Sequence, residues 1–144
     1  MSNPTEEFGL TLAAISRAWR NKLDERLRTL GLSQAKWATL LHLSHNPDGL
    51  IQKELADRIG IEGPTLVRLL DRLEIDGWVT RSASATDRRI RIVQLTSKAG
   101  PLLDKIQKIA DKLRQEVLGD VAASELGICI DFMRKIRKRI DSLD

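Results

Sequence analysis

The residues of this sequence best suited to specific chemistry are arginines. Arg68 and Arg72 are four positions apart, and Arg88, Arg89 and Arg91 follow within one short polar stretch. A guanidinium group presents five N–H donors in a rigid fork, which matches a phosphate or two acceptors on the edge of one guanine. This pattern favours recognition of an anion or a nucleic-acid base, and Arg68 is the strongest candidate for a guanine contact.

The groups required for catalysis and metal binding are scarce. A lone cysteine, Cys129, excludes a disulfide within the chain and a cysteine-based zinc cluster. His42 and His45 lie three positions apart, and two ligands do not make a four-ligand site. Without a constellation of nucleophile, acid and base, we expect no catalytic residue, no metal and no cofactor. Cys129 stands between Ile128 and Ile130 and is expected to be a buried small hydrophobic residue.

Length and composition are typical of one folded domain. The chain has 144 residues, of which 42% are hydrophobic and 31% charged, and this excludes a disordered tail protein. No apolar stretch approaches the ~20 residues that a transmembrane helix requires. Glu6 and Glu7 lie where a secretory signal would carry basic residues. These features predict a cytoplasmic protein.

Positive charge is concentrated in one part of the chain. The formal net charge is +4, and residues 78–100 carry five basic side chains against one acidic side chain. A local surplus of this kind indicates a polyanionic partner. Residues 134–139 hold five basic side chains in six positions, but they fall in the last turns of an expected helix, where cations complement the helix dipole. We therefore assign this second cluster to the helix and not to a nucleic-acid site.

Apolar residues at spacings of three and four predict that most of the chain is helical. The expected helices span about 6–30, 34–45, 52–59, 63–77 and 123–141, and a further long helix is capped by Thr96 and ends at Gly119. Ser33 has the type of side chain that caps a helix, and Gly31 and Gly60 are expected helix stops. Residues 78–82 are expected to form a short strand, and residues 90–95 alternate mostly on a period of two, which predicts its partner in a β-hairpin with a polar loop over 83–89.

The helices over 52–59 and 63–77 are joined by a tight glycine turn and form a helix-turn-helix pattern. Ala56 is small enough for the helices to approach, Gly60 takes the turn, and Ile61 is expected to fill the core between them. We predict that Val67 and Leu70 hold the second helix in place. An ordinary helical hairpin in a bundle is the alternative. The exposed face of the second helix would present the candidate DNA contacts Thr65, Arg68, Leu69 and Arg72.

The hairpin that follows has a charged tip formed by Asp87, Arg88 and Arg89, and Arg91 comes two residues later. A charged β-wing beside a recognition helix can enter the minor groove, and narrow A·T-rich grooves attract arginine. Asp87 is expected to accept hydrogen bonds from Arg89 or from the loop backbone and so to hold the tip in shape. The alternatives are a solvated turn for the tip and a strand-surface charge for Arg91.

With these motifs the chain resembles the MarR family of winged-helix transcriptional regulators, and within it the SlyA branch. The resemblance covers almost the whole chain. It is carried by residues 52–60, Pro64 to Arg68, Leu73 and Glu74 with Gly77, Asp87-Arg88-Arg89, Leu95 and Thr96 with Ala99, and Trp19, Arg20 and Trp37.

The resemblance implies a mainly α fold with a winged helix-turn-helix lobe, including a two-stranded β-wing, over about 33–98. Helices over about 6–30 and 99–144 would form a dimerisation lobe. The implied function is that of a sequence-specific DNA-binding transcriptional regulator that is not an enzyme. It would act as a homodimer on a pseudo-palindromic A·T-rich operator, with the recognition helix in the major groove and the wing in the minor groove.

The resemblance also implies a small-molecule effector, because members of the family often bind aromatic carboxylates. Arg17, Arg20 and Trp37 are candidates for the effector pocket, and buried dimer packing with surface arginines is their alternative role. No cysteine lies in the first half of the chain or near the wing, so the oxidant sensing of some related regulators is not expected.

Two other classes of protein compete with this interpretation. A helical dimer could use the same lobe to bind a protein, and a small enzyme would need a catalytic dyad or a cofactor loop, which the sequence lacks. Salt dependence separates DNA binding from protein binding, because contacts to phosphates release condensed counterions.

Overall fold

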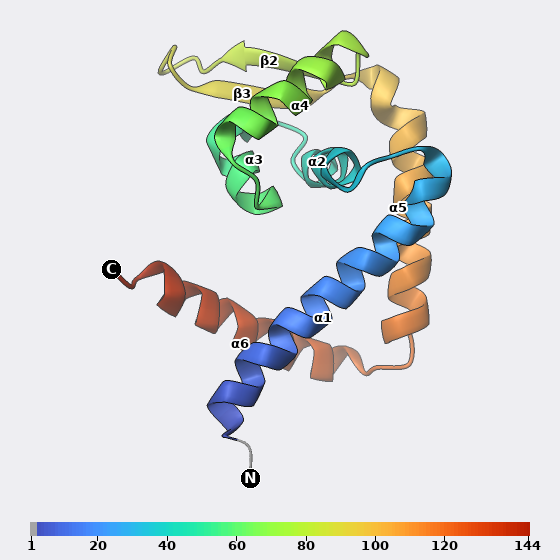
Figure 1. Ribbon diagram of the computed structural model, residues 1–144, viewed down its shortest axis with the longest axis vertical. Coiled ribbons are helices and arrows are strands. Elements are labelled where there is room, and N and C mark those ends of the chain that lie inside the picture. Colours follow the sequence, from blue (N-terminus) through green and yellow to red (C-terminus); the bar gives the residue numbers. More distant parts are fainter. Residues whose placement is uncertain (1–2) are drawn as a thin grey trace. The chain divides into compact units, whose positions relative to one another are not determined.

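The computed structural model describes residues 3–144, which form two compact units. The first unit runs to Ala110, the second covers Asp111–Asp144, and α5 (Gly100–Leu118) continues from one into the other. The other elements are α1 (Pro4–Leu27), η1 (Arg28–Leu30), α2 (Gln34–Ser44), β1 (Leu50–Ile51), α3 (Gln52–Ile59), α4 (Gly63–Ile75), β2 (Val79–Ala83), β3 (Arg91–Leu95), η2 (Ser97–Ala99) and α6 (Ala123–Asp141) (Figure 1). The predicted mainly α winged-helix fold is confirmed. None of the helices in residues 3–144 is both long and apolar enough to cross a membrane.

Short-range signals set several of the helix ends. The Ser33 hydroxyl accepts a hydrogen bond from the Lys36 N–H at 3.3 Å, so the predicted cap of α2 is confirmed. Gly31 and Gly60 end η1 and α3 in the left-handed region, with φ of 72° and 78°. The predicted cap at Thr96 is wrong. The Thr96 hydroxyl donates instead to the carbonyl oxygen of Gly77. Thr96 is also separated from the start of α5 by η2.

The hairpin is part of a three-stranded antiparallel sheet in the order β1-β3-β2, so the wing has one strand more than predicted. Arg81 of β2 pairs with Val93 of β3, and Leu50 of β1 pairs with Val93 from the other side. Gly49, directly before β1, has a φ of 93°, which glycine adopts readily because it lacks a Cβ atom. The short strand thereby ties the segment before α3 to the base of the wing.

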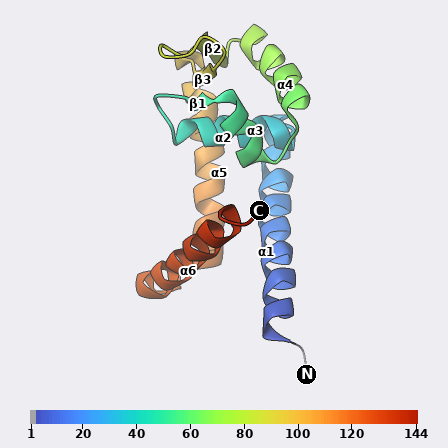
Figure 2. The same ribbon diagram turned by 90° about the vertical axis from the view of Figure 1, so that its left-hand side faces the viewer.

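The core of the first unit lies among α2, α3, α4 and the sheet, as Figure 2 shows. Each fully buried leucine contributes about 1.5–3 kcal/mol relative to an exposed one. The buried Thr39 hydroxyl donates to the Ala35 carbonyl at 2.7 Å, and no buried side-chain N or O atom in residues 3–144 lacks a hydrogen-bond partner. The fully buried side chains include Leu40, Leu43, Leu55, Leu66, Leu70, Leu73, Val79 and Val93.

Two predicted core residues lie at the surface. Val67 is 37% exposed. The buried stripe of α4 runs through Leu66 and Leu70, and Val67 lies about a quarter turn around the helix axis from this stripe. Cys129 is exposed as well, so its predicted burial is wrong for the single chain. It lies on α6, a helix with no buried residue, and its neighbour Ile128 is 72% exposed.

Candidate nucleic-acid interface

The amphipathic pattern of α4 determines which of its side chains face outward. Leu66, Leu70 and Leu73 are buried on one stripe and anchor the helix. Pro64 lies in the first turn, where its missing N–H would have had no helical partner. Of the predicted contacts, Thr65, Arg68 and Arg72 are exposed, while Leu69 is half-buried. The N-terminal half of α4 therefore presents a hydroxyl and a guanidinium group to solvent.

The turn before α4 is fixed by the backbone. The N–H groups of Gly60 and Ile61 both donate to the Ala56 carbonyl, at 2.9 and 3.2 Å. Ala56 is buried and Ile61 is half-buried, so the two helices meet at the predicted small residue. This closed turn holds α3 and α4 as a helix-turn-helix.

The tip of the wing is shaped by Asp87. Its Oδ1 atom accepts from the backbone N–H of Arg89 at 3.0 Å and from the Arg89 Nε–H at 3.3 Å. These bonds, first from the backbone and then from the side chain, lower the pKa of Asp87 below its ordinary value. The Ile90 N–H donates to the Asp87 carbonyl at 3.1 Å. Within the described residues Arg88 makes no hydrogen bond or ion pair, and its exposed guanidinium is free for a ligand.

The third arginine of the predicted wing group lies elsewhere. Arg91 is on the same face of the sheet as Val93 and Arg81. It lines a hollow together with Gln52 and Glu74. The structure thus brings Arg88 and Arg89 together at the tip and separates Arg91 from them.

One residue of this region was missed by the sequence interpretation. Arg81 of β2 forms ion pairs with Asp71 at 2.6 Å and Glu74 at 3.1 Å, both on α4. In the sequence, the only indication of this contact is that Asp71 and Glu74 lie three positions apart on one helix. Their partner becomes evident only when β2 is placed against α4. The ion pairs link α4 to β2.

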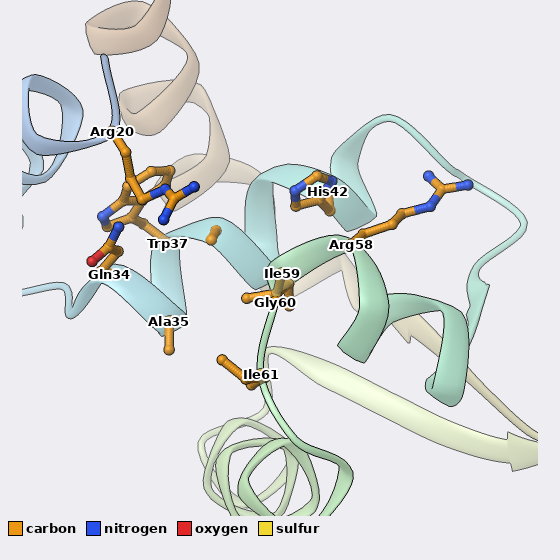
Figure 3. A pocket seen from close by; sticks show the side chains of 10 residues that line it. Arg20, Gln34, Ala35, Trp37, His42, Arg58, Ile59, Gly60 and Ile61 are labelled. Atoms are coloured by element: carbon orange, nitrogen blue, oxygen red, sulfur yellow. The ribbon is translucent and has the colours of Figure 1, made fainter. Parts of the chain in front are cut away.

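A cavity of about 460 Å³ lies beside the helix-turn-helix, and its lining includes Arg20, Trp37, His42 and the turn residues Gly60 and Ile61. Figure 3 shows the Arg20 and Trp37 side chains close together at one end, with His42 farther along. Trp37 also donates its indole N–H to Asp24 at 3.2 Å. Two of the three predicted effector-pocket residues are thus brought together.

The third predicted pocket residue, Arg17, is exposed on α1 and does not line this cavity. Burial, followed by the charge of Arg58 and the neighbouring His45, lowers the pKa of His42 below its ordinary value. Arg58 is itself paired with Glu54 at 2.7 Å. Residues 3–144 contain no group of three or more His, Cys, Asp or Glu side chains placed to hold a metal ion.

Comparison with known proteins assigns the family. Residues 30–90 match the model of the MarR family. The transcriptional regulator PA3341 is 47% identical, with 94% of this chain and 99% of that chain covered at a TM-score of 0.86. MepR from S. aureus, in its DNA-binding conformation, is 25% identical (92% and 98% covered, TM-score 0.80). NadR in complex with 4-hydroxyphenylacetate is 21% identical (90% and 91% covered, TM-score 0.80). The chain therefore belongs to the MarR family, whose members are transcriptional regulators and not enzymes.

Proposed function

We propose that this regulator binds a pseudo-palindromic A·T-rich operator in the cytoplasm as a homodimer, with α4 in the major groove and the wing in the minor groove. The observation that best supports this proposal is that Arg68 on α4 and Arg88 on the wing are both exposed on one compact unit. A guanidinium on a recognition helix can read guanine, and a guanidinium on a wing is attracted to a narrow groove. Thr65, Leu69, Arg72, Arg89 and Arg91 complete the proposed interface.

The homodimer is supported by apolar side chains that the single chain leaves uncovered. On α1, Leu12 and Ile15 are 42% and 58% exposed, and on α6, Ile130, Met133 and Ile140 are 41–56% exposed. Rows of exposed apolar residues are typical of interaction surfaces, and a two-fold axis lets one surface cover its own copy. Two recognition helices about 34 Å apart would then match an inverted repeat.

The effector in this proposal is a small aromatic carboxylate bound in the cavity beside the helix-turn-helix. Arg20 supplies a cation and Trp37 an aromatic surface. The ligand in the NadR structure, 4-hydroxyphenylacetate, belongs to this chemical class. Gly60 and Ile61 line the same cavity, so a ligand would contact the turn that positions α4. We infer that binding there releases the operator.

The test begins with selection of bound sites from random DNA, followed by titration of the selected duplex at several salt concentrations. We expect recovery of an inverted repeat with A·T-rich flanks and a steep loss of affinity with salt, because each phosphate contact contributes about 0.9 to the slope of log affinity against log salt. Half-site duplexes serve as the control and should bind more weakly. Recovery of no common sequence, or binding that is insensitive to salt, would contradict the proposal and favour a protein-binding module.

Asp87→Ala should weaken DNA binding several-fold, although it removes a negative charge. The reason is that Asp87 accepts from the Arg89 backbone and side chain and so shapes the tip. We would measure affinity for duplexes with A·T-rich and G·C-rich flanks at one salt concentration, with the larger loss expected for the A·T-rich flanks. The matched control is Asp104→Ala, which removes an exposed acid of the same type from α5. Tighter binding of Asp87→Ala to both duplexes would contradict this role of Asp87 and would mean that the wing acts as a basic loop without a fixed shape.

Neutralising the basic end of α6 should leave the salt dependence of DNA binding almost unchanged. The change is to glutamine at Arg134, Lys135, Lys138 and Arg139 together, positions that the proposal places away from DNA. The comparison variant is Arg88→Gln with Arg89→Gln, which should reduce the slope of log affinity against log salt by about 2. A reduction of several units for the α6 variant would show that the DNA-binding face has been wrongly assigned.

A further inference from the structure

A single guanidinium connects the wing to the recognition helix. Arg81 projects from β2, and its Nη2 and Nε groups donate to Asp71 at 2.6 Å and to Glu74 at 3.1 Å. Its side chain is only 18% exposed, whereas the two acids are about half exposed. Asp71 and Glu74 are three positions apart and lie on one side of α4, so they offer acceptors along the helix to one planar donor.

The buried stripe of Leu66, Leu70 and Leu73 anchors the core side of α4, and Arg81 forms ion pairs with its outer side. At the C-terminal end of the helix, the Trp78 N–H donates to the Leu73 carbonyl at 2.9 Å and closes the connection to β2. Beside these ion pairs lies a hollow of about 360 Å³, which is lined by Gln52, Val67, Glu74, Arg81 and Arg91. Arg81 therefore holds the helix and the strand together at the edge of that hollow.

The charges of Arg81, Asp71 and Glu74 also favour one fixed position of the Arg81 side chain. Burial of Arg81 lowers its pKa, but the hydrogen bonds and charges of Asp71 and Glu74 outweigh burial and raise the pKa above its ordinary value. The guanidinium thus remains charged and paired. A lysine in its place would carry the same charge without the rigid fork, and it could not hold both acceptors in one plane.

We propose that Arg81 is a positioning residue that sets the distance between the wing and α4, and thereby the spacing that the operator must have between its A·T-rich flank and its major-groove site. This inference rests on the proposed function, because it concerns how the two DNA-contacting parts are held apart. One base pair inserted between the two parts of the site moves them about 3.4 Å along the duplex. A rigid connection should reject that shift and a loose one should accept it.

The experiment measures the affinity of the full chain for the selected duplex and for duplexes with one base pair inserted or deleted between flank and major-groove site. We expect wild type to bind the altered duplexes at least tenfold more weakly. We call the affinity for the selected duplex divided by that for an altered duplex the spacing ratio. In Arg81→Gln the spacing ratio should fall below about threefold, and in Arg81→Lys it should stay as low. Arg28→Gln is the matched control: it removes the guanidinium of η1 that pairs with Asp24 of α1 at 3.4 Å, and it should keep the full ratio.

A second variant separates position from charge. Asp71→Asn combined with Glu74→Gln leaves Arg81 in place, removes its charged acceptors and makes the protein more positive. It should bind all duplexes at least as tightly as wild type and still lose the spacing ratio, whereas Arg81→Gln makes the protein less positive. Full spacing ratios in both variants, or no spacing preference in wild type that binds the selected duplex, would overturn the inference alone. Failure of wild type to bind any selected duplex would overturn the proposed function itself.

Discussion

Arg68→Ala is expected to lower the affinity for the selected operator by about 5- to 150-fold, corresponding to about 1–3 kcal/mol, with little change on random duplex DNA. Arg68 is exposed in the first half of α4, two positions after the buried Leu66 that anchors this part of the helix. A guanidinium at this position can donate to both acceptors of one guanine, which random sequence supplies only by chance. The measurement is a pair of titrations, on operator and on random duplex, at one salt concentration.

Arg68→Lys is the matched control, because it keeps the charge and removes the fork. We expect lysine to retain the affinity for random DNA and to recover only part of the affinity for the operator. If Arg68→Ala weakened binding to both duplexes equally, Arg68 would contact only phosphate, and the base would be read by another residue.

Gly49→Ala is expected to lower the free energy of unfolding by about 2–5 kcal/mol. Gly49 has a φ of 93°, where an L-residue is strained by roughly 1–2 kcal/mol. A Cβ atom at Gly49 would also lie 2.7 Å from the carbonyl oxygen of Val93 and 2.6 Å from Cγ of Gln94. Because the oxygen belongs to the sheet backbone, relief requires β1 and β3 to separate, at a typical overpacking cost of about 1–3 kcal/mol. Urea unfolding followed by circular dichroism gives the difference.

The chain supplies a close control for this substitution. Gly60 has a similar φ of 78°, but a Cβ atom there would meet no atom within 4 Å. Gly60→Ala should therefore lower the free energy of unfolding only by the backbone strain, about 1–2 kcal/mol. Equal costs at Gly49 and Gly60 would mean that β1 does not pack against β3 as closely as described.

Features determined by neighbours in the sequence could be predicted. Ser33 caps α2 through a bond to a residue three positions on, and Gly60 ends α3 through its own backbone conformation. Asp87 and Arg89 are two positions apart, and their contact was among those expected. The amphipathic pattern likewise indicated that Arg68 and Arg72 would lie on the open side of α4. Each of these inferences needed only local geometry.

Features determined by distant partners could not be predicted. β1 has only two residues and follows a turn, so it carries no alternation, and it exists because Val93 offers a backbone partner. The pairing of Arg81 with two acids of α4 depends on the placement of a strand against a helix. Cys129 was expected to be buried because its neighbours are apolar, but burial requires a covering surface that apolar neighbours do not provide.

The pairing of β1 with β3 has a consequence for how the chain folds. Leu50 and Val93 join the two ends of a long stretch that contains α3, α4 and β2, whereas β2 and β3 meet across a short loop. Closing a long loop loses more chain entropy than closing a hairpin, and contacts distant in sequence slow folding. We expect the hairpin to form early and the closure by β1 to come later. α4 is therefore held in place only after β1 has paired with β3. A fragment that ends before β3 would contain α3 and α4 but not the strand pairing that encloses them.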